Sequence, residues 1–146
     1  EAHVVEVMKQ TGAVLGGEGN GGVIYPRSHY GRDALVGIAL LLSHIAIEKQ
    51  PLTALRAGLP HYEMFKHKIQ FGPEVDTAAL LARLAESEAN ETLTLIDGVK
   101  IDYADSWAHI RRSNTEPIMR IYTEAPTMAH AQELALLFEQ KLLTLP

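Results

Sequence analysis

The stretch Thr92-Leu93-Thr94-Leu95-Ile96-Asp97-Gly98-Val99-Lys100-Ile101-Asp102-Tyr103 decides the fold of the second half of the chain. Two runs of β-branched and other apolar residues flank Asp97-Gly98, a dipeptide typical of tight β-hairpin turns. The stretch therefore predicts two antiparallel strands, at residues 92–96 and 99–103, joined by a short turn.

Further strands and helices surround this hairpin in the sequence. They are predicted strands at residues 62–71, 107–111 and 118–123, and predicted helices at residues 76–89 and from residue 126 onward. We summarise the order from residue 61 onward as β-α-β-β-β-α. This order predicts an α+β domain, with a four-stranded, mostly antiparallel sheet and two helices on one of its faces.

The first half of the chain has a different pattern. Residues 2–10 and 32–49 predict helices, and the second helix is apolar on nearly all sides, which is typical of a helix with several packing partners. Gly58 and Pro60 then interrupt the pattern. We assign residues 1–50 to one domain, residues 51–60 to a linker and residues 61–146 to a second domain.

The composition argues against several classes of protein. The chain has 146 residues, 47% of them apolar, and a formal net charge of −5. Broad binding to nucleic acid or to an anionic membrane requires a basic field, so we expect neither partner. The absence of Cys excludes disulfides and thiol catalysis and fits a cytoplasmic location. The longest apolar run, residues 34–47, is too short to span a bilayer.

The first candidate site is the glycine-rich segment Gly17-Glu18-Gly19-Asn20-Gly21-Gly22. It matches the G-x-G-x-x-G pattern of dinucleotide-binding loops, but those loops open directly into a helix, whereas a strand-like run follows here. A carboxylate beside an amide suits neighbouring sugar hydroxyls, so Glu18 and Asn20 are candidate carbohydrate ligands. The alternative is a glycine-rich turn with an exposed glutamate.

The second candidate site is Arg111-Arg112-Ser113-Asn114-Thr115-Glu116-Pro117, followed by Arg120. Its guanidinium, hydroxyl and amide groups, together with the amides of the loop backbone, are the donors that a phosphate dianion requires. The alternative is a polar loop between two strands, with Arg120 paired to Glu116 or Glu124.

We expect no metal site and no bound cofactor in this chain. Asp97, Asp102 and Asp105 are close in sequence, but the first belongs to the hairpin turn and the second to a strand. A solvated face explains them better than a metal site does. The seven His residues have no recognisable zinc-binding spacing.

Together, the two loops resemble motifs of the α-D-phosphohexomutases, which comprise phosphoglucomutases, phosphomannomutases and phosphoglucosamine mutases. The glycine-rich segment resembles the family's sugar-recognition loop, Gly-Glu-x-Ser-Gly-(His or Gly). Residues 107–120 resemble its phosphate-binding loop, R-P-S-(G/N)-T-E-P with a following Arg. Asn20 stands where the family commonly has Ser, which leaves the sugar open. Arg112 stands where it commonly has Pro, which makes the loop more flexible and more basic.

The resemblance covers essentially the whole chain but only the end of a four-domain architecture. The chain also starts at Glu1, within a helical pattern and without an initiator Met, so we expect a C-terminal fragment of a longer protein. The resemblance implies a remnant of an α/β third domain, followed by a TBP-like fourth domain. The implied ligands of the sugar are Glu18 and Asn20, and those of the phosphate are Arg111, Ser113, Asn114, Thr115 and Arg120.

The resemblance also implies an isomerase that interconverts hexose 6-phosphate and hexose 1-phosphate through a phosphoserine and a bisphosphate intermediate. The serine loop and the Mg²⁺-binding loop belong to the family's first two domains, so we expect this chain to hold no catalytic residue and to be inactive alone. The parent would be a phosphoglucosamine mutase or a phosphoglucomutase/phosphomannomutase.

The expected partners are a hexose phosphate and the missing N-terminal domains of the same chain. The apolar helix at residues 32–49 would lose much of its packing in a truncated domain, which favours self-association of the fragment. The alternative function is a free-standing phosphosugar-binding module without catalysis. The coding sequence upstream of Glu1 would distinguish this module from an enzyme.

Overall fold

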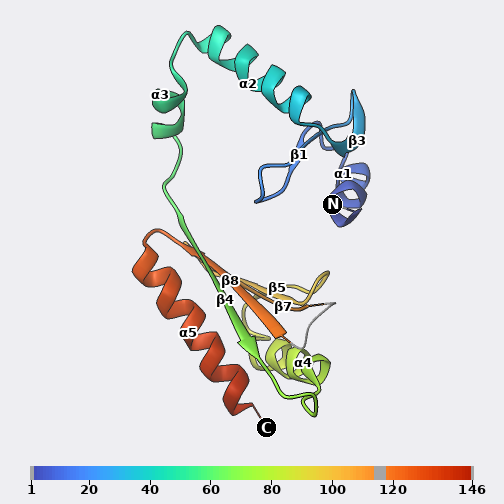
Figure 1. The fold of residues 1–146 in the computed structure, drawn as a ribbon, viewed down its shortest axis with the longest axis vertical. Coiled ribbons are helices and arrows are strands. Elements are labelled where there is room, and N and C mark those ends of the chain that lie inside the picture. Colours follow the sequence, from blue (N-terminus) through green and yellow to red (C-terminus); the bar gives the residue numbers. More distant parts are fainter. Residues whose placement is uncertain (1, 114–117, 146) are drawn as a thin grey trace. The chain divides into compact units, whose positions relative to one another are not determined.

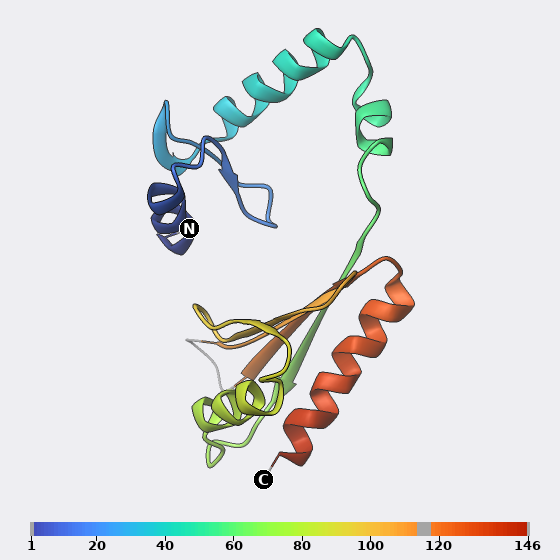
Figure 2. The same cartoon turned by 180° about the vertical axis from the view of Figure 1, so that it is seen from behind.

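The computed structural model describes residues 2–113 and 118–145 of the chain, seen from two sides in Figures 1 and 2. The chain divides into two compact units, and we call the part up to Pro60 unit 1 and the part from His61 onward unit 2. Within the described residues, no helix combines the length and the apolar character that a membrane crossing requires.

Unit 1 contains a small sheet and the helices that precede and follow it in the chain. They are α1 (Ala2–Thr11), β1 (Gly16–Gly17), β2 (Val23–Tyr25), β3 (His29–Arg32), α2 (Ala34–Glu48) and α3 (Leu52–Ala57). The strands pair antiparallel in the order β1-β2-β3. Among the described residues of this unit, the buried apolar side chains are those of Met8 and Ile24, so the core of unit 1 is small.

Helix α2 begins at a cap that the sequence encodes. The Asp33 carboxylate accepts hydrogen bonds from the backbone N–H groups of Leu35 and Val36, at 2.9 and 3.0 Å. At the other end, Lys49 adopts a left-handed conformation with a φ of 55°. None of the residues of α2 is buried, and Leu35 is 78% exposed. The apolar pattern of this helix therefore has no matching core within unit 1.

We predict that unit 1 exchanges its backbone amide hydrogens faster than unit 2 does. Few buried apolar contacts stabilise strands β1 and β2, so these strands should open with a smaller free energy than the central strands of unit 2. Hydrogen–deuterium exchange of the 146-residue chain measures both sets of amides in one sample. Equal protection of residues 14–24 and of the described amides within residues 93–122 would contradict the prediction.

Unit 2 contains one five-stranded sheet and two helices. The strands are β4 (Glu63–Gln70), β5 (Thr92–Thr94), β6 (Val99–Asp102), β7 (Trp107–Arg112) and β8 (Ile118–Ala125), in the spatial order β4-β8-β7-β6-β5. All neighbouring strands are antiparallel. The predicted number of four strands is wrong by one, because both arms of the hairpin at residues 92–103 join the sheet.

The predicted hairpin is present, but its turn is wider than the sequence suggested. Thr94 pairs with Lys100, so the first strand ends at Thr94 and not at Ile96. Gly98 has a φ of +83°, and a side chain at this position would collide with the β7 backbone. The turn therefore spans residues 95–98, and the glycine at position 98 permits a close approach to β7.

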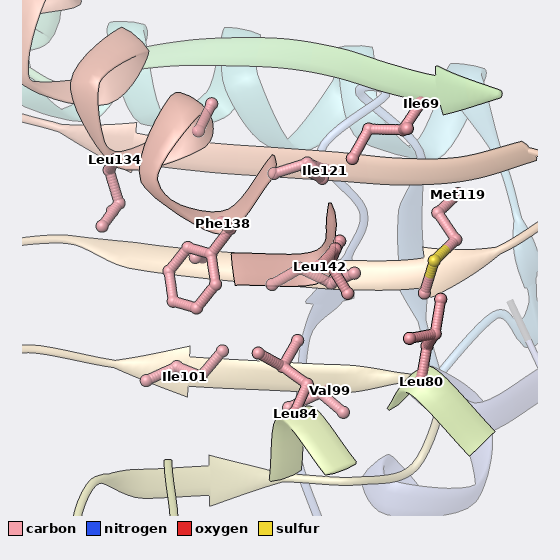
Figure 3. Packing of buried hydrophobic residues seen from close by; sticks show 13 residues of the cluster. Ile69, Leu80, Leu84, Val99, Ile101, Met119, Ile121, Leu134, Phe138 and Leu142 are labelled. Carbon is pink, nitrogen blue, oxygen red and sulfur yellow. The ribbon is translucent and has the colours of Figure 1, made fainter. Parts of the chain in front are cut away.

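Both helices of unit 2, α4 (Thr77–Ser87) and α5 (Met128–Thr144), pack on one face of the sheet. Asp76 caps α4 by accepting hydrogen bonds from the N–H groups of Ala78 and Ala79. Figure 3 shows the resulting core, in which side chains of the helices meet side chains of the strands. They include Leu80, Leu84, Leu134, Phe138 and Leu142 from the helices, and Ile69, Val99, Ile101, Met119 and Ile121 from the strands.

Side chains alternate between the two faces of this sheet. Along β8, Met119, Ile121 and Thr123 are buried beneath the helices. The residues between them, Arg120 and Tyr122, therefore lie on the opposite face, which we call the open face. The alternation places polar and charged residues of β4, β7 and β8 together on the open face.

Candidate functional site

The glycine-rich segment of unit 1 forms a hairpin between β1 and β2. The Glu18 N–H donates to the Gly22 carbonyl at 3.1 Å, and the Gly21 N–H donates to the Glu18 carbonyl at 2.9 Å. Gly21 has a φ of +87°, a backbone conformation that residues with side chains rarely adopt. Strand β2 follows the glycines, and helix α2 begins only at Ala34, so the structure agrees with the rejection of a dinucleotide-binding loop.

The two predicted sugar ligands, Glu18 and Asn20, lie next to each other in this hairpin. The Asn20 amide nitrogen donates to the Glu18 carboxylate at 3.4 Å, and the Asn20 amide oxygen accepts from the Gly22 N–H at 2.9 Å. Arg32 at the end of β3 forms an ion pair with Glu18 at 3.3 Å. The backbone and Arg32 thus hold an acceptor and a combined donor and acceptor in fixed positions.

An open pocket of about 460 Å³ lies beside Asn20 and Arg32, and Glu18 is not among its lining residues. Its lining comprises residues of the glycine hairpin, the end of β3 and the start of α2: Asn20, Gly21, Gly22, Val23, Arg32, Asp33 and Ala34. A pocket of this size, with amide and charged groups converging on it, can hold a small polar molecule such as a monosaccharide.

The second candidate site lies where β7 ends and β8 begins. Arg111 is on β7, and the Ser113 N–H donates to the Ile118 carbonyl at 2.9 Å, which closes the base of the connection. The predicted ligands Asn114 and Thr115 lie outside the described residues. Arg111 pairs directly with Arg120 across the two strands, so the structure brings both predicted arginine ligands together.

Arg111 is held by an acid and by an aromatic ring. Its guanidinium contacts the Asp97 carboxylate at 3.0 Å and lies 5.7 Å from the centre of the Tyr122 ring. Burial lowers the pKa of Arg111, but the hydrogen bond to Tyr122 and the charge of Asp97 outweigh burial and raise this pKa above its usual value. Arg111 therefore keeps its positive charge, in an orientation fixed by its neighbours.

The neighbouring Arg112 has a different setting. Successive residues of a strand point to opposite faces, so Arg112 does not share the open face with Arg111. Arg112 is exposed, and its charge contributes to the lowered pKa of Asp76, for which hydrogen bonds from the N–H groups of Ala79 and Ala78 are the larger causes. The two consecutive arginines thus offer one candidate anion ligand and one charge-matched control.

Sequence reasoning missed three residues that support these sites. Arg32 was included only as the first residue of the predicted helix at residues 32–49, Asp97 only as a turn residue and a rejected metal ligand, and Tyr122 only as part of a strand. Because β6, β7 and β8 lie side by side, residues separated by 11 or 14 positions can meet. The strand pairing is the signal that could have identified Asp97 and Tyr122.

The described residues contain no candidate metal centre. Within residues 2–113 and 118–145, no group of three or more His, Asp or Glu residues is arranged to hold a metal ion. The donors at both sites are better matched to hydroxyls and to anions.

Comparison with protein families gives two matches, one for each half of the chain. Residues 1–62 match the family model described as phosphoglucomutase/phosphomannomutase, alpha/beta/alpha domain III. Residues 73–141 match the model of the phosphoglucomutase/phosphomannomutase C-terminal domain. The glycine hairpin falls within the first match and the arginine pair within the second.

Curated relatives match over most of the chain. A probable phosphoglucosamine mutase of Methanopyrus kandleri is 33% identical over 92% of the chain and 30% of its own length. A phosphoglucomutase/phosphomannomutase of Thermococcus kodakarensis is 35% identical over 89% of the chain and 28% of its own length. A phosphomannomutase/phosphoglucomutase of Pseudomonas putida is 32% identical over 93% of the chain. The chain thus spans about 30% of the length of these relatives.

A solved structure supports the same match. The crystal structure of a phosphoglucomutase/phosphomannomutase family protein from Burkholderia thailandensis has a TM-score of 0.71 and 29% sequence identity to this chain. The similarity covers 95% of this chain and 30% of that protein. The fold described above is thus one that occurs within a larger protein of known structure.

Proposed function

Because the chain belongs to the phosphoglucomutase/phosphomannomutase family, with its domain III and its C-terminal domain represented, we propose that it is the substrate-binding portion of a phosphohexomutase. The observation that carries the proposal is the cross-strand pair of Arg111 and Arg120 beside Ser113. Two guanidinium groups, one on the strand before a loop and one on the strand after it, are suited to a phosphate dianion, which accepts charge-assisted hydrogen bonds from several directions.

The two loops have complementary roles in this proposal. Glu18 and Asn20 bind hydroxyls of the sugar, because Asn20 lines an open pocket and its amide nitrogen donates to the Glu18 carboxylate. Arg111, Ser113 and Arg120, with Asn114 and Thr115 added from the sequence motif, bind the phosphate that does not react. Separate anchors for sugar and phosphate suit a substrate that must be held in two opposite orientations during one catalytic cycle.

We place the phosphoryl transfer outside this chain. The phosphoserine and the Mg²⁺ ligands implied by the family resemblance would belong to the parts of a longer protein that this chain does not match. What this portion contributes is orientation of the substrate and neutralisation of its charge. The substrate class is a hexose phosphate, and relatives with both phosphoglucosamine mutase and phosphoglucomutase/phosphomannomutase names leave both parents open.

The proposal also covers the location of the protein and the classes of partner that it does not bind. The lack of Cys supports a cytoplasmic location, and the net charge of −5 argues against nucleic acid and membrane partners.

The exposed apolar side chains of α2, such as Leu35, Ile38 and Leu42, would be covered by the rest of a complete domain. When the 146-residue chain is produced alone, a second copy can cover them, which favours self-association.

Activity assays test whether the phosphoryl transfer requires a part of the protein that lies upstream of this chain. The 146-residue chain should not convert hexose 6-phosphate to hexose 1-phosphate even with Mg²⁺ and a hexose bisphosphate activator, whereas the protein encoded with its upstream sequence should. In that longer protein, Glu18→Gln should lower kcat/KM by about 10- to 100-fold, the effect of losing hydrogen bonds to a charged group. Glu6→Gln, an exposed charge change on α1, is the matched control and should have no effect.

Two results would contradict the proposal. One is turnover by the 146-residue chain that persists after repurification from a host lacking hexose phosphate mutases. The other is a gene in which a stop codon and then a start site directly precede the codon of Glu1. That arrangement would favour a free-standing binding module. Loss of phosphate binding in Glu18→Gln would instead show that the roles of the two loops are reversed.

A further inference from the structure

Three basic residues stand in one row across the open face of unit 2. Lys68 of β4 pairs with Arg120 of β8, and Arg120 pairs with Arg111 of β7. Like charges placed directly opposite each other on a sheet destabilise it. Because unit 2 keeps three of them in register, the arrangement requires either compensation within the protein or a ligand of opposite charge.

Tyr122 stands next to this row and contacts its members. Its ring centre lies 5.7 Å from the Arg111 guanidinium and 5.8 Å from the ammonium group of Lys66. Burial raises the pKa of the Tyr122 hydroxyl, but the guanidinium groups of Arg111 and Arg120 beside it outweigh burial and lower this pKa below the usual value for tyrosine.

The nearby acids compensate only part of this charge. Asp97 pairs with Arg111 at 3.0 Å. On the same face, Glu124 accepts from the indole N–H of Trp107 at 3.1 Å, and Asp102 pairs with Lys100. Unit 2 as a whole has more acidic than basic residues, so its open face is a local basic region in an acidic domain.

The groups that face Tyr122 come from both neighbouring strands. On β4 they are Lys66 and Lys68, and on β7 they are His109 and Arg111, with His109 directly opposite Tyr122 in the register. The His109 ring is engaged with the Asp97 carbonyl. All four of these neighbours are basic. An anion bound among them would lie close to the Tyr122 hydroxyl and would change its pKa.

We propose that Tyr122 is a positioning residue of the phosphate site, whose hydroxyl and ring hold Arg111 and Arg120 together as one two-armed ligand for a phosphate dianion. The inference rests on the proposed function, and it adds a residue that neither loop motif contains. The hydroxyl joins the two guanidinium groups, while the ring reduces their repulsion by a cation–π contact with Arg111. Asp97 also holds the Arg111 guanidinium, through an ion pair at 3.0 Å.

Inorganic phosphate is the probe for the test, added to the 146-residue chain and followed by NMR. Tyr122→Phe keeps the ring but removes the hydroxyl, and should weaken phosphate binding by about three- to tenfold, as expected for the loss of a hydrogen-bonding group. Tyr122→Leu removes the ring as well and should weaken it further. Tyr103→Phe is the matched control, since Tyr103 lies near Glu88 and Glu91 and not near the arginine pair.

A second measurement uses the wild-type chain and follows the pKa of Tyr122 as phosphate is added. A tyrosine that only packs in the sheet, away from the bound phosphate, would keep its pKa. Phosphate bound to Arg111 and Arg120 places negative charge near the Tyr122 hydroxyl and disfavours its ionisation. The pKa of Tyr122 should therefore rise by about half a unit or more when phosphate saturates the chain, and that of Tyr103 should not change. The ring-carbon resonances of both tyrosines report these values.

The outcomes separate this inference from the proposed function. If the wild-type chain binds phosphate, but Tyr122→Phe binds it equally well and the pKa of Tyr122 does not change, the positioning role is wrong and the phosphate site remains. If the wild-type chain shows no phosphate-dependent change at any resonance, the proposed phosphate site is wrong and the inference falls with it.

Discussion

Replacing Arg111 with alanine is expected to weaken the binding of inorganic phosphate to the chain by about 10- to 100-fold, because the substitution removes charge-assisted hydrogen bonds. The wild-type affinity should be of millimolar order, since an exposed site must overcome anion hydration and the entropic cost of association. Titration of ¹⁵N-labelled chain with phosphate measures both constants. The largest shifts should occur at Arg111, at Ser113 and at Arg120.

Arg112→Ala is the control for this experiment. It makes the same change of charge one residue further along β7, on a side chain that does not share the open face with Arg111. Phosphate affinity should fall by no more than about twofold, as expected for an exposed charge screened by solvent. If phosphate shifts the amides of residues 16–22 instead, and Arg111→Ala binds as the wild type does, the two loops have been assigned the wrong way round.

The largest effect on stability is expected from Phe138→Ala. The Phe138 side chain is fully buried between α5 and the sheet, with an exposed fraction of 0%. Its removal leaves a cavity, and such substitutions cost about 3–5 kcal/mol of unfolding free energy. A domain of this size is stabilised by about 5–15 kcal/mol in total, so the loss is a large part of it.

Leu137→Ala provides the matched control on the same helix. Leu137 is 44% exposed, and its truncation should cost less than about 1 kcal/mol. Urea denaturation, followed by the fluorescence of Trp107 in unit 2, measures both variants against the wild type. A Phe138→Ala variant with the stability of Leu137→Ala would show that the core of unit 2 is packed differently from Figure 3.

Local signals in the sequence predicted much of unit 2. Asp76 is followed by a helix because a short carboxylate can bond to the free N–H groups of the first turn, and this interaction is present. Asp97-Gly98 predicted the hairpin for a similar local reason. The close approach of Gly98 to β7 could not be predicted, because β7 lies later in the sequence and only the folded sheet brings the two together.

The residues of the candidate sites also form two groups, those that a local sequence pattern identifies and those that it does not. Glu18 and Asn20 are two residues apart, and Arg111 lies beside the loop motif, so a contiguous pattern could identify them. Asp97 and Tyr122 have no motif of their own. Their relation to Arg111 arises from the register of three strands, which only the folded sheet defines.

The alternation along β8 has a consequence for how this protein can evolve. Met119 and Ile121 support the core, while Arg120 and Tyr122 between them carry the proposed site. Inserting or deleting one residue in this strand would move the arginine into the hydrophobic layer and an isoleucine or methionine into the site. Ancestral and related sequences should therefore differ along β8 by substitution and not by length, and new specificity can arise on one side of the strand while the other side stays unchanged.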